Sequence, residues 1–277
     1  PDLRPPTSDF RLPKMPSDPI LPSRYAIGKV RISATNLEEA ADILLAQAQR
    51  GEPGYVCAPN VRATYIANRE TDYTDILNRS LLTVPDGKPL VWYAHLCGLG
   101  HVRRTCGPDL FNRICAATEK TEHSHYFFGS TPEVIQKLET EVRAKFPRLK
   151  VVGMQSPPFA PVEVLAESGI VEEINRLRPT FVWVGLGAPK QERFIARIID
   201  RIDASLLLAV GLVFEYEAGT VKRAPRWMQR CGLEGVARVC QQPERTGRAA
   251  KVFSWMIGML ALRAVRRIFR GRDSFEK

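Results

Sequence analysis

The alternation of short apolar runs with amphipathic segments is the feature that most constrains this fold. The run Phe-Val-Trp-Val at 181–184 is followed by a turn rich in glycine and then by an amphipathic segment at 190–202. Apolar runs of the same kind occur at 55–58, 81–84, 125–128, 149–154 and 205–210. Nearly continuous apolar strands separated by helices are typical of a parallel sheet that is covered on both faces. The sequence therefore predicts an α/β, Rossmann-like fold, with a mostly parallel sheet flanked by helices.

Local signals add detail to this pattern. Asn36 as N-cap and Gly51 as terminator bound a predicted amphipathic helix. Residues 27–33 are predicted to form one short strand, and residues 205–220 the last apolar strand.

A polar residue or a glycine follows each of five predicted strands. These residues are Asn60, Asp86, Gly129, Gln191 and Gly211. Ligands of such sheets bind at the carboxyl ends of the strands, so we expect these residues to meet at one edge.

For two of these positions the sequence offers both a chemical role and a purely structural one. Asp86 could act as a general base or bind a sugar hydroxyl. The amide of Asn60 could both donate and accept hydrogen bonds. Asn and Asp are also common turn residues, so a purely structural role is the alternative at both positions.

The two glycine-rich turns suit an anionic ligand. Gly129 precedes a helix N-terminus, where backbone amides can bind phosphate. The turn after residue 184 combines the flexible backbone of Gly187 with the side chains of Lys190 and Gln191. Lys190 and Glu192 could instead form a salt-bridged brace, which makes Gln191 the stronger candidate for substrate contact.

Positive charge is concentrated in the last fifth of the chain. From Lys222 onward 14 lysines and arginines accompany 4 acidic residues, so this segment carries the whole net charge of +10. Such a segment indicates a polyanionic partner, either nucleic acid or an anionic membrane face. A solvated basic face is the alternative.

The sequence gives little support for metal binding or redox chemistry. The six cysteines form no CxxC pair and are typical of reduced thiols in a cytosolic protein. The four histidines are not at metal-ligand spacing with carboxylates, and we expect His123 and His125 at the surface. There is no Walker loop and no GxSxG motif. We therefore expect neither a metal nor a cofactor.

The C-terminal segment, 248–277, is predicted to contain a basic amphipathic helix. Its apolar stretch of about 11 residues is too short to span a bilayer, which takes about 20. Its arginines recur at spacings of three and four: Arg263, Arg266, Arg267 and Arg270. Three aromatic residues typical of an interfacial helix accompany them: Phe253, Trp255 and Phe269. We expect this appendage to bind an anionic membrane and to reach a lipid-linked diphosphate; packing on the body or on a second copy is the alternative.

The N-terminal residues 1–24 are rich in proline and lack the apolar core of a signal peptide. We expect a mobile or surface-draped leader, followed by an α/β domain over 25–247.

A series of motifs over roughly residues 25–248 resembles the WecG/TagA/CpsF glycosyltransferase family. The motifs are APN at 58–60, PDG at 85–87, TCGPDL at 105–110, FFGS at 127–130, GLGAPKQE at 185–192, AVGLVFEYEAG at 209–219, VKRAPRWMQRCGLEG at 221–235 and QQPER at 241–245. The resemblance implies an inverting, metal-independent enzyme that moves a hexose or N-acetylhexosamine-type sugar from a UDP-sugar. The acceptor would be a polyprenyl-diphosphate-linked sugar at the cytoplasmic face of the membrane, in surface polysaccharide or cell-wall polymer synthesis.

The resemblance also implies residue roles. Asp86 matches the proposed catalytic base of the family, Asn60 and Gln191 match residues of the sugar pocket, and Arg104 matches a basic residue suited to the diphosphate. Without a metal, cationic side chains and backbone amides would stabilise the leaving UDP. The remaining candidate substrate-binding positions are Gly129, Gly187, Lys190, Gly211, Glu215 and Arg223.

Three departures from the family pattern bear on specificity. Ala58 stands where a threonine is usual, so one pocket hydroxyl is missing. Glu215 replaces an aspartate and could still bind a ribose with a longer reach. Gly235 replaces a tryptophan. The first two departures suggest a donor other than UDP-N-acetylmannosamine, with a plain hexose as one option.

Two other functions are weaker. A nucleotide- or nucleic-acid-binding protein would use the basic tail, but only Trp227 and Trp255 offer stacking there, so we expect no nucleic acid. A dinucleotide-dependent oxidoreductase would need the GxGxxG fingerprint, which is missing. Self-association through the leader or the tail remains open.

Overall fold

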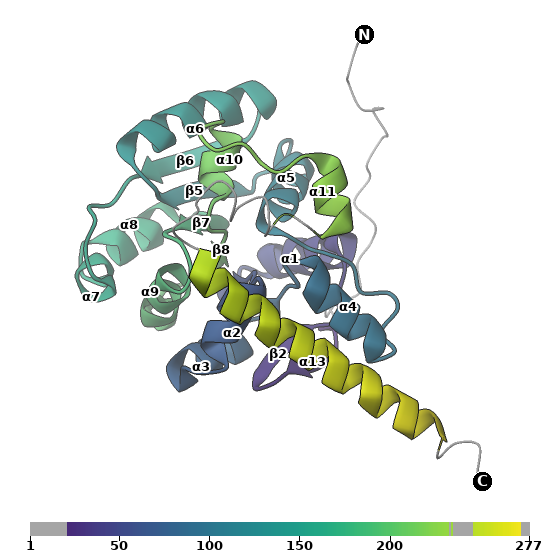
Figure 1. The fold of residues 1–277 in the computed structure, drawn as a ribbon. Helices are drawn as coiled ribbons and strands as arrows, with labels where there is room; N and C mark the ends of the chain where they lie inside the picture. Colours follow the sequence, from purple (N-terminus) through teal and green to yellow (C-terminus); the bar gives the residue numbers. More distant parts are fainter. Residues whose placement is uncertain (1–20, 233, 235–245, 273–277) are drawn as a thin grey trace.

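The computed structural model describes residues 21–232, 234 and 246–272. Six parallel strands form the central sheet in the order β4-β3-β8-β7-β5-β6. The strands are β3 (Gly54–Cys57), β4 (Leu82–Thr83), β5 (Ser124–Gly129), β6 (Lys150–Gln155), β7 (Phe181–Gly185) and β8 (Leu206–Ala209). The predicted Rossmann-like α/β class is confirmed (Figure 1). Most of the predicted leader lies outside the described residues.

Helices cover both faces of the sheet. One face carries α1 (Leu37–Arg50), α5 (Gly107–Thr118), α6 (Pro132–Lys145) and α10 (Val213–Glu217). The other carries α2 (Val61–Ala67), α3 (Thr71–Arg79), α4 (Lys88–Leu96), α7 (Val162–Ala166), α8 (Ile170–Leu177) and α9 (Lys190–Ile198). A 3-10 turn, η1 (Ile199–Arg201), ends α9, and α11 (Arg226–Cys231) follows later in the chain.

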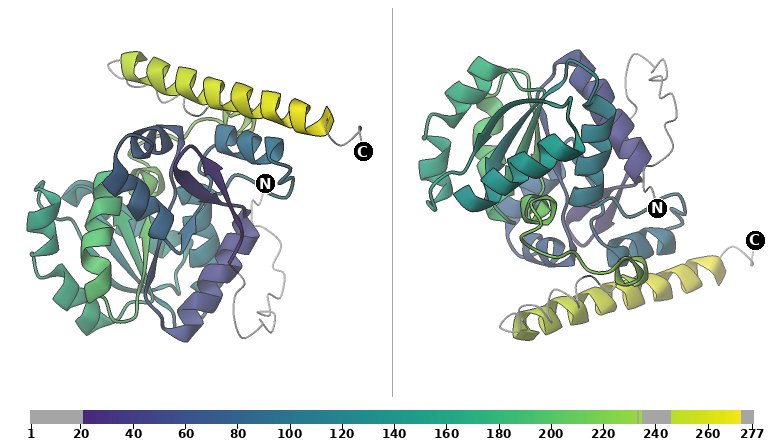
Figure 2. Two further views of the ribbon diagram at one scale, coloured as in Figure 1. Left: turned by 90° about the horizontal axis from the view of Figure 1, so that it is seen from below. Right: turned by 90° about the horizontal axis from the view of Figure 1, so that it is seen from above.

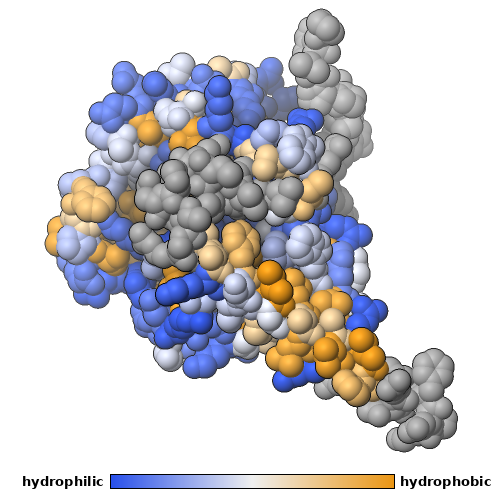
Figure 3. Space-filling model, viewed as in Figure 1, coloured by the Kyte–Doolittle hydropathy of each residue, from blue (hydrophilic) through white to orange (hydrophobic). Residues whose placement is uncertain are grey.

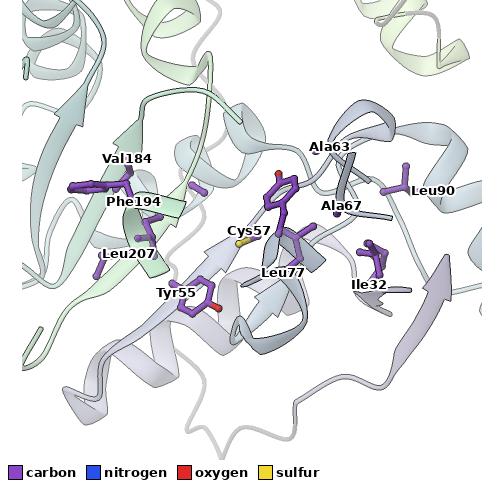
Figure 4. Close-up of a cluster of buried hydrophobic side chains, with 14 of the residues drawn as sticks. Ile32, Tyr55, Cys57, Ala63, Ala67, Leu77, Leu90, Val184, Phe194 and Leu207 are labelled. Atoms are coloured by element: carbon purple, nitrogen blue, oxygen red, sulfur yellow. The ribbon is translucent and has the colours of Figure 1, made fainter. Parts of the chain in front are cut away.

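The apolar strands contribute side chains to two hydrophobic cores, one on each face of the sheet. Tyr55 and Cys57 of β3 point into one core and Val56 into the other. Residues of β3, β7 and β8 meet α2, α3 and α9 in the first core, as Figure 4 shows around Cys57 and Phe194. Because both faces are covered, the strands carry apolar residues at consecutive positions rather than alternate ones.

Three segments differ from the sequence-based prediction. Residues 27–33 do not form one strand: β1 (Arg24–Ile27) and β2 (Val30–Ser33) pair antiparallel around a turn at Gly28, which has φ +64°. The last strand ends at Ala209, and the apolar run continues into α10. Helix α5 was not predicted.

The expectation of surface histidines at 123 and 125 is wrong for His125. This side chain is fully buried, stacked on Phe181 and Trp183. The Trp183 indole N–H donates to its Nδ1 at 3.0 Å, and its Nε2 lies 2.9 Å from the hydroxyl oxygen of Thr118. Burial lowers the pKa of His125 to about 3, so it is a neutral core residue.

The predicted C-terminal helix is α13 (Thr246–Arg272), which lies along one side of the body (Figure 2). Its first half packs on the body: Val252 and Met256 are buried, and the Trp255 ring meets Tyr65 edge-on with centroids 5.5 Å apart. The alternative of packing on the body therefore holds for this half, and Trp255 is not a free interfacial aromatic. Among the described residues, no helix is long and apolar enough to cross a bilayer.

Candidate functional site

The loops that carry the predicted site residues lie together at the carboxyl edge of the sheet. Strands β4, β3, β8, β7 and β5 are consecutive neighbours in the sheet. The residues that follow them are, in the same order, Asp86, Asn60, Gly211, Gly187 and Ser130. Five loops thus place backbone amides and polar side chains along one edge of the sheet, which is where this type of sheet binds ligands.

Glycine is required where β5 and β7 end side by side. Gly129 has φ +141°, and a Cβ atom at this position would lie 2.4 Å from the carbonyl oxygen of Gly185. No side chain fits there. The backbone of the two strands thus stays close at the site, and the next residue, Ser130, is held with φ 58°.

Gln191 ties two of the loops together. Its side-chain oxygen accepts hydrogen bonds from the backbone N–H of Gly187 at 3.0 Å and of Gly211 at 2.9 Å. Its amide nitrogen donates to Glu192 at 3.0 Å, and the side chain is 3% exposed. Gln191 therefore acts on the site through the loops after β7 and β8, rather than by presenting its side chain to solvent.

Glu192 is buried next to Gln191, whose side chain joins the two loops. One carboxylate oxygen holds Gln191, while the other has no hydrogen-bond partner. The hydroxyl of Tyr73 faces the carboxyl group without making a hydrogen bond of good geometry. Burial raises the pKa of Glu192 to about 7, and its hydrogen bonds only partly offset this effect.

The predicted salt bridge between Lys190 and Glu192 is wrong. The ammonium group of Lys190 lies instead over the ring of Phe159, 4.8 Å from its centroid. Lys190 begins α9 and can turn outward, whereas Glu192 is on the buried side of the same helical turn.

Glu215 faces the turn after β5. Its Oε1 accepts a hydrogen bond from the Ser130 hydroxyl at 2.8 Å, and its Oε2 is buried without a hydrogen-bond partner. The Ser156 hydroxyl donates to the carbonyl of Ser130 at 2.8 Å, which fixes the same turn. The second oxygen of Glu215 is thus a buried acceptor without a donor, which is costly unless a ligand hydroxyl supplies one.

A cluster of charged side chains lies at the other end of the edge. Arg104 pairs with Glu234 and lies 3.9 Å from Asp86. Arg223 donates to Asp109 at 2.7 Å and lies 3.6 Å from Glu234. Two guanidinium groups thus face three carboxylates, and Glu234 bridges both of them.

The electrostatics of this cluster keep both arginines charged. Burial opposes the charge of Arg104, but Cys106, Asp86 and Glu234 outweigh it and raise its pKa. Burial likewise opposes the negative charge of Asp109, but the hydrogen bond from Arg223 is stronger and lowers the pKa of that carboxyl group.

Sequence reasoning missed Asp109 and Glu234. Asp109 is in the first turn of α5, where Pro108 and an acidic residue are ordinary signals of a helix start. Glu234 carries no such local signal, because Arg104, the residue that donates a hydrogen bond to it, lies 130 residues away in the chain.

The predicted residue Asn60 is the N-cap of α2. Its side-chain oxygen accepts from the backbone N–H of Ala63 at 3.0 Å, which leaves the amide NH₂ group to donate elsewhere. Arg62 in the first turn of α2 donates to the carbonyl of Ala188 at 3.5 Å and so reaches the loop after β7.

The arginines of α13 lie apart from this edge. Arg267 donates to the carbonyl of His95 at 3.2 Å, while Arg263 and Arg266 line a cleft against α4. Arg270 belongs to α13, but its side chain is outside the described residues, as is the predicted departure at Gly235. Within the described ranges, no three His, Cys, Asp or Glu side chains come together as metal ligands.

Comparison with known proteins gives the same family as the motifs. The model of the glycosyl transferase WecG/TagA/CpsF family matches residues 25–270. A protein of Bacillus subtilis strain 168, named N-acetylglucosaminyldiphosphoundecaprenol N-acetyl-beta-D-mannosaminyltransferase, is 27% identical over 201 residues, which cover 73% of this chain and 77% of the relative. A protein of the same name from Bacillus spizizenii strain W23 is 25% identical over 206 residues, which cover 74% and 78%.

Proposed function

This chain belongs to the WecG/TagA/CpsF family of glycosyl transferases, and on that premise we propose that it moves a sugar from a UDP-sugar to a polyprenyl-diphosphate-linked sugar. The printed name of the two Bacillus relatives supports an acceptor of this class. The product would serve in the synthesis of a surface polysaccharide or cell-wall polymer.

Asp86 is the proposed catalytic base. It takes the proton from the acceptor hydroxyl as that oxygen attacks the anomeric carbon, and UDP leaves from the opposite face of the sugar. The single displacement inverts the anomeric configuration. The position of Asp86 directly after β4, 3.9 Å from Arg104, is the observation that carries this proposal.

Cationic side chains and loop amides would bear the charge of the leaving UDP. Arg104 and Arg223 are both ionised, and Arg104 lies beside the base; a diphosphate can replace the carboxylate of Glu234 between the two guanidinium groups. The backbone N–H groups of Gly187 and Gly211 already donate to Gln191, which holds in place two loops whose other backbone amides would add donors. Such prearranged donors stabilise the transition state without a metal ion.

Two positions bear on the donor. The free oxygen of Glu215 would accept a hydrogen bond from the ribose of UDP. Ala58 offers no hydroxyl to the sugar, so the donor is a hexose or an N-acetylhexosamine that needs no hydrogen bond there.

The outer half of α13 would hold the enzyme at the inner face of the cell membrane. Large apolar side chains of this helix are exposed on one side: Ile257, Leu262, Val265, Ile268 and Phe269 (Figure 3). Arg266 and Arg267 of the same helix are also exposed. An amphipathic helix of this composition lies in the interface of an anionic bilayer.

The test of the catalytic proposal is Asp86→Asn. We expect this variant to fold and to bind UDP like the wild type, while kcat for UDP release falls by about 10²–10⁴-fold, the usual contribution of a general base. The assay screens UDP-sugars against a short-chain polyprenyl-diphosphate sugar with EDTA present, and NMR reads the anomeric configuration of the product.

Asp109→Asn is the matched control, because it removes a carboxylate from the same cluster without touching the proposed base. We expect it to raise KM for the donor more than it lowers kcat, since it removes the carboxylate that Arg223 contacts at 2.7 Å and leaves Arg223 only its longer contact with Glu234. Near-full turnover by Asp86→Asn would refute the assignment of the base, and loss of activity in EDTA would refute metal independence.

A further inference from the structure

A cleft of about 590 Å³ lies between the body and the second half of α13, residues 259–272. Its walls are Tyr25 and Ala26 of β1, Tyr93 of α4, and Leu262, Arg263 and Arg266 of α13. The volume is within the range of small-molecule sites, about 300–1,000 Å³.

The cleft has the charge of an anion site. It has two arginines and no acidic residue in its lining. Within the part of the chain that the structure describes, neither Arg263 nor Arg266 has an ion-pair partner. The Nε–H of Arg263 is buried without an acceptor. A buried donor without an acceptor is costly, and a guanidinium group suits phosphate oxygens in particular.

The cleft also has an apolar side. Tyr25, Tyr93 and Leu262 are among its lining residues. Val265 and Phe269, three and seven residues after Leu262 on α13, are exposed on the same side of the helix. Its ligand should therefore combine a phosphate group with a hydrocarbon chain.

The position of the cleft argues against the diphosphate of the glycosyl acceptor. Cys97, which also lines the cleft, directly follows the last residue of α4, whereas Asp86 precedes the start of that helix. The nine residues of α4 span about 13 Å at 1.5 Å per residue. The acceptor diphosphate must lie within one sugar of the base, which is closer than this.

We propose that this cleft binds the phosphate head group of an anionic membrane phospholipid, with Arg263 and Arg266 on the phosphate and the acyl chains along Leu262 and Phe269. The proposal rests on the membrane association proposed above. It adds a defined lipid site to what would otherwise be a general attraction between a basic helix and an anionic surface.

Two kinds of variant test the site in the full-length protein. Arg263→Gln/Arg266→Gln removes the two charges, and Lys251→Gln/Arg267→Gln is the matched control, because it removes the same charge from α13 outside the cleft. Ala26→Trp blocks the cleft at unchanged net charge, since Ala26 lines it and is exposed. Circular dichroism and thermal melting check that each variant is folded.

Calorimetry measures binding of dihexanoyl phosphatidylglycerol, dihexanoyl phosphatidylcholine and inorganic phosphate. We expect the phosphatidylglycerol to bind best. Its affinity should fall by about tenfold or more in both Arg263→Gln/Arg266→Gln and Ala26→Trp, and by about twofold or less in the control. Equal losses in the two double variants with no loss in Ala26→Trp would overturn the proposal, as would inorganic phosphate binding as tightly as the lipid.

Sedimentation with vesicles of phosphatidylcholine, with and without phosphatidylglycerol, separates this proposal from the proposed membrane association. Vesicle binding that none of the cleft variants weakens more than the control leaves the association intact and overturns the cleft site. Absence of vesicle binding, with the short-chain lipid still bound and still blocked by Ala26→Trp, supports the cleft site and overturns the association. Displacement of the lipid by a short-chain polyprenyl diphosphate at equal affinity would assign the cleft to the acceptor instead.

Discussion

Glu192→Gln tests the electrostatic reasoning about the buried carboxyl group that accepts a hydrogen bond from Gln191. The carboxyl group of Glu192 is 1% exposed, and burial raises its pKa from 4.5 to about 7. A carboxyl group whose pKa is raised on folding binds its proton more tightly in the folded state. Wild-type stability should therefore fall as the pH rises from about 4.5 to about 7 and then level off.

The magnitude follows from the size of the pKa shift. With 1.36 kcal/mol per pKa unit, the free energy of unfolding contributed by Glu192 should drop by about 2.5 kcal/mol between pH 5 and pH 8. A glutamine at this position does not titrate, still accepts the hydrogen bond from Gln191, and can donate to the unpartnered hydroxyl of Tyr73. The stability advantage of the variant over the wild type should grow by this amount over that pH range.

Urea unfolding at pH 5, 6, 7 and 8 measures this difference. Glu163→Gln is the control, because Glu163 is exposed on α7 and the same substitution there removes a carboxylate that is not buried. An advantage of Glu192→Gln that stays constant from pH 5 to pH 8 would refute the argument that burial governs this carboxyl group.

Two further predictions concern the loops and the charged cluster. Glu234→Gln should strengthen UDP binding several-fold in calorimetry, because Arg104 and Arg223 lose the carboxylate that bridges them; weaker binding would show that Glu234 holds the arginines in place for the ligand. Gly129→Ala should lower the free energy of unfolding by about 2–5 kcal/mol in urea titration, because the new Cβ meets the carbonyl of Gly185 at 2.4 Å and φ is +141°. A loss below about 1 kcal/mol would mean that the two strands can separate there.

The fold class could be predicted because its signals are local. Strands buried on both faces are apolar along their whole length, and the intervening helices are amphipathic, whatever the order of the strands. Caps are equally local: Asn36 accepts a hydrogen bond from the N–H of Glu39, and Gly51 adopts the left-handed conformation, as predicted. The parallel class also predicted that residues following the strands meet at the carboxyl edge of the sheet, and Asp86 lies there because it follows β4.

The local errors have local causes. The apolar run after Ala209 continues through Val213 and Phe214, so hydrophobicity alone did not show that the strand ends and α10 begins. His125 is polar by type, but Trp183 and Thr118 satisfy both ring nitrogens inside the core.

The sequence by itself determined the α/β class, the family and the sheet edge that carries the candidate site. Only the tertiary structure decided which side chains meet at that edge. Gln191 bonds the loops of β7 and β8 because those strands are neighbours, and Glu234 bridges Arg104 and Arg223 across more than 100 residues of chain. Such pairings depend on strand order and on the path of the chain between elements, and hydrophobic periodicity carries no information about either.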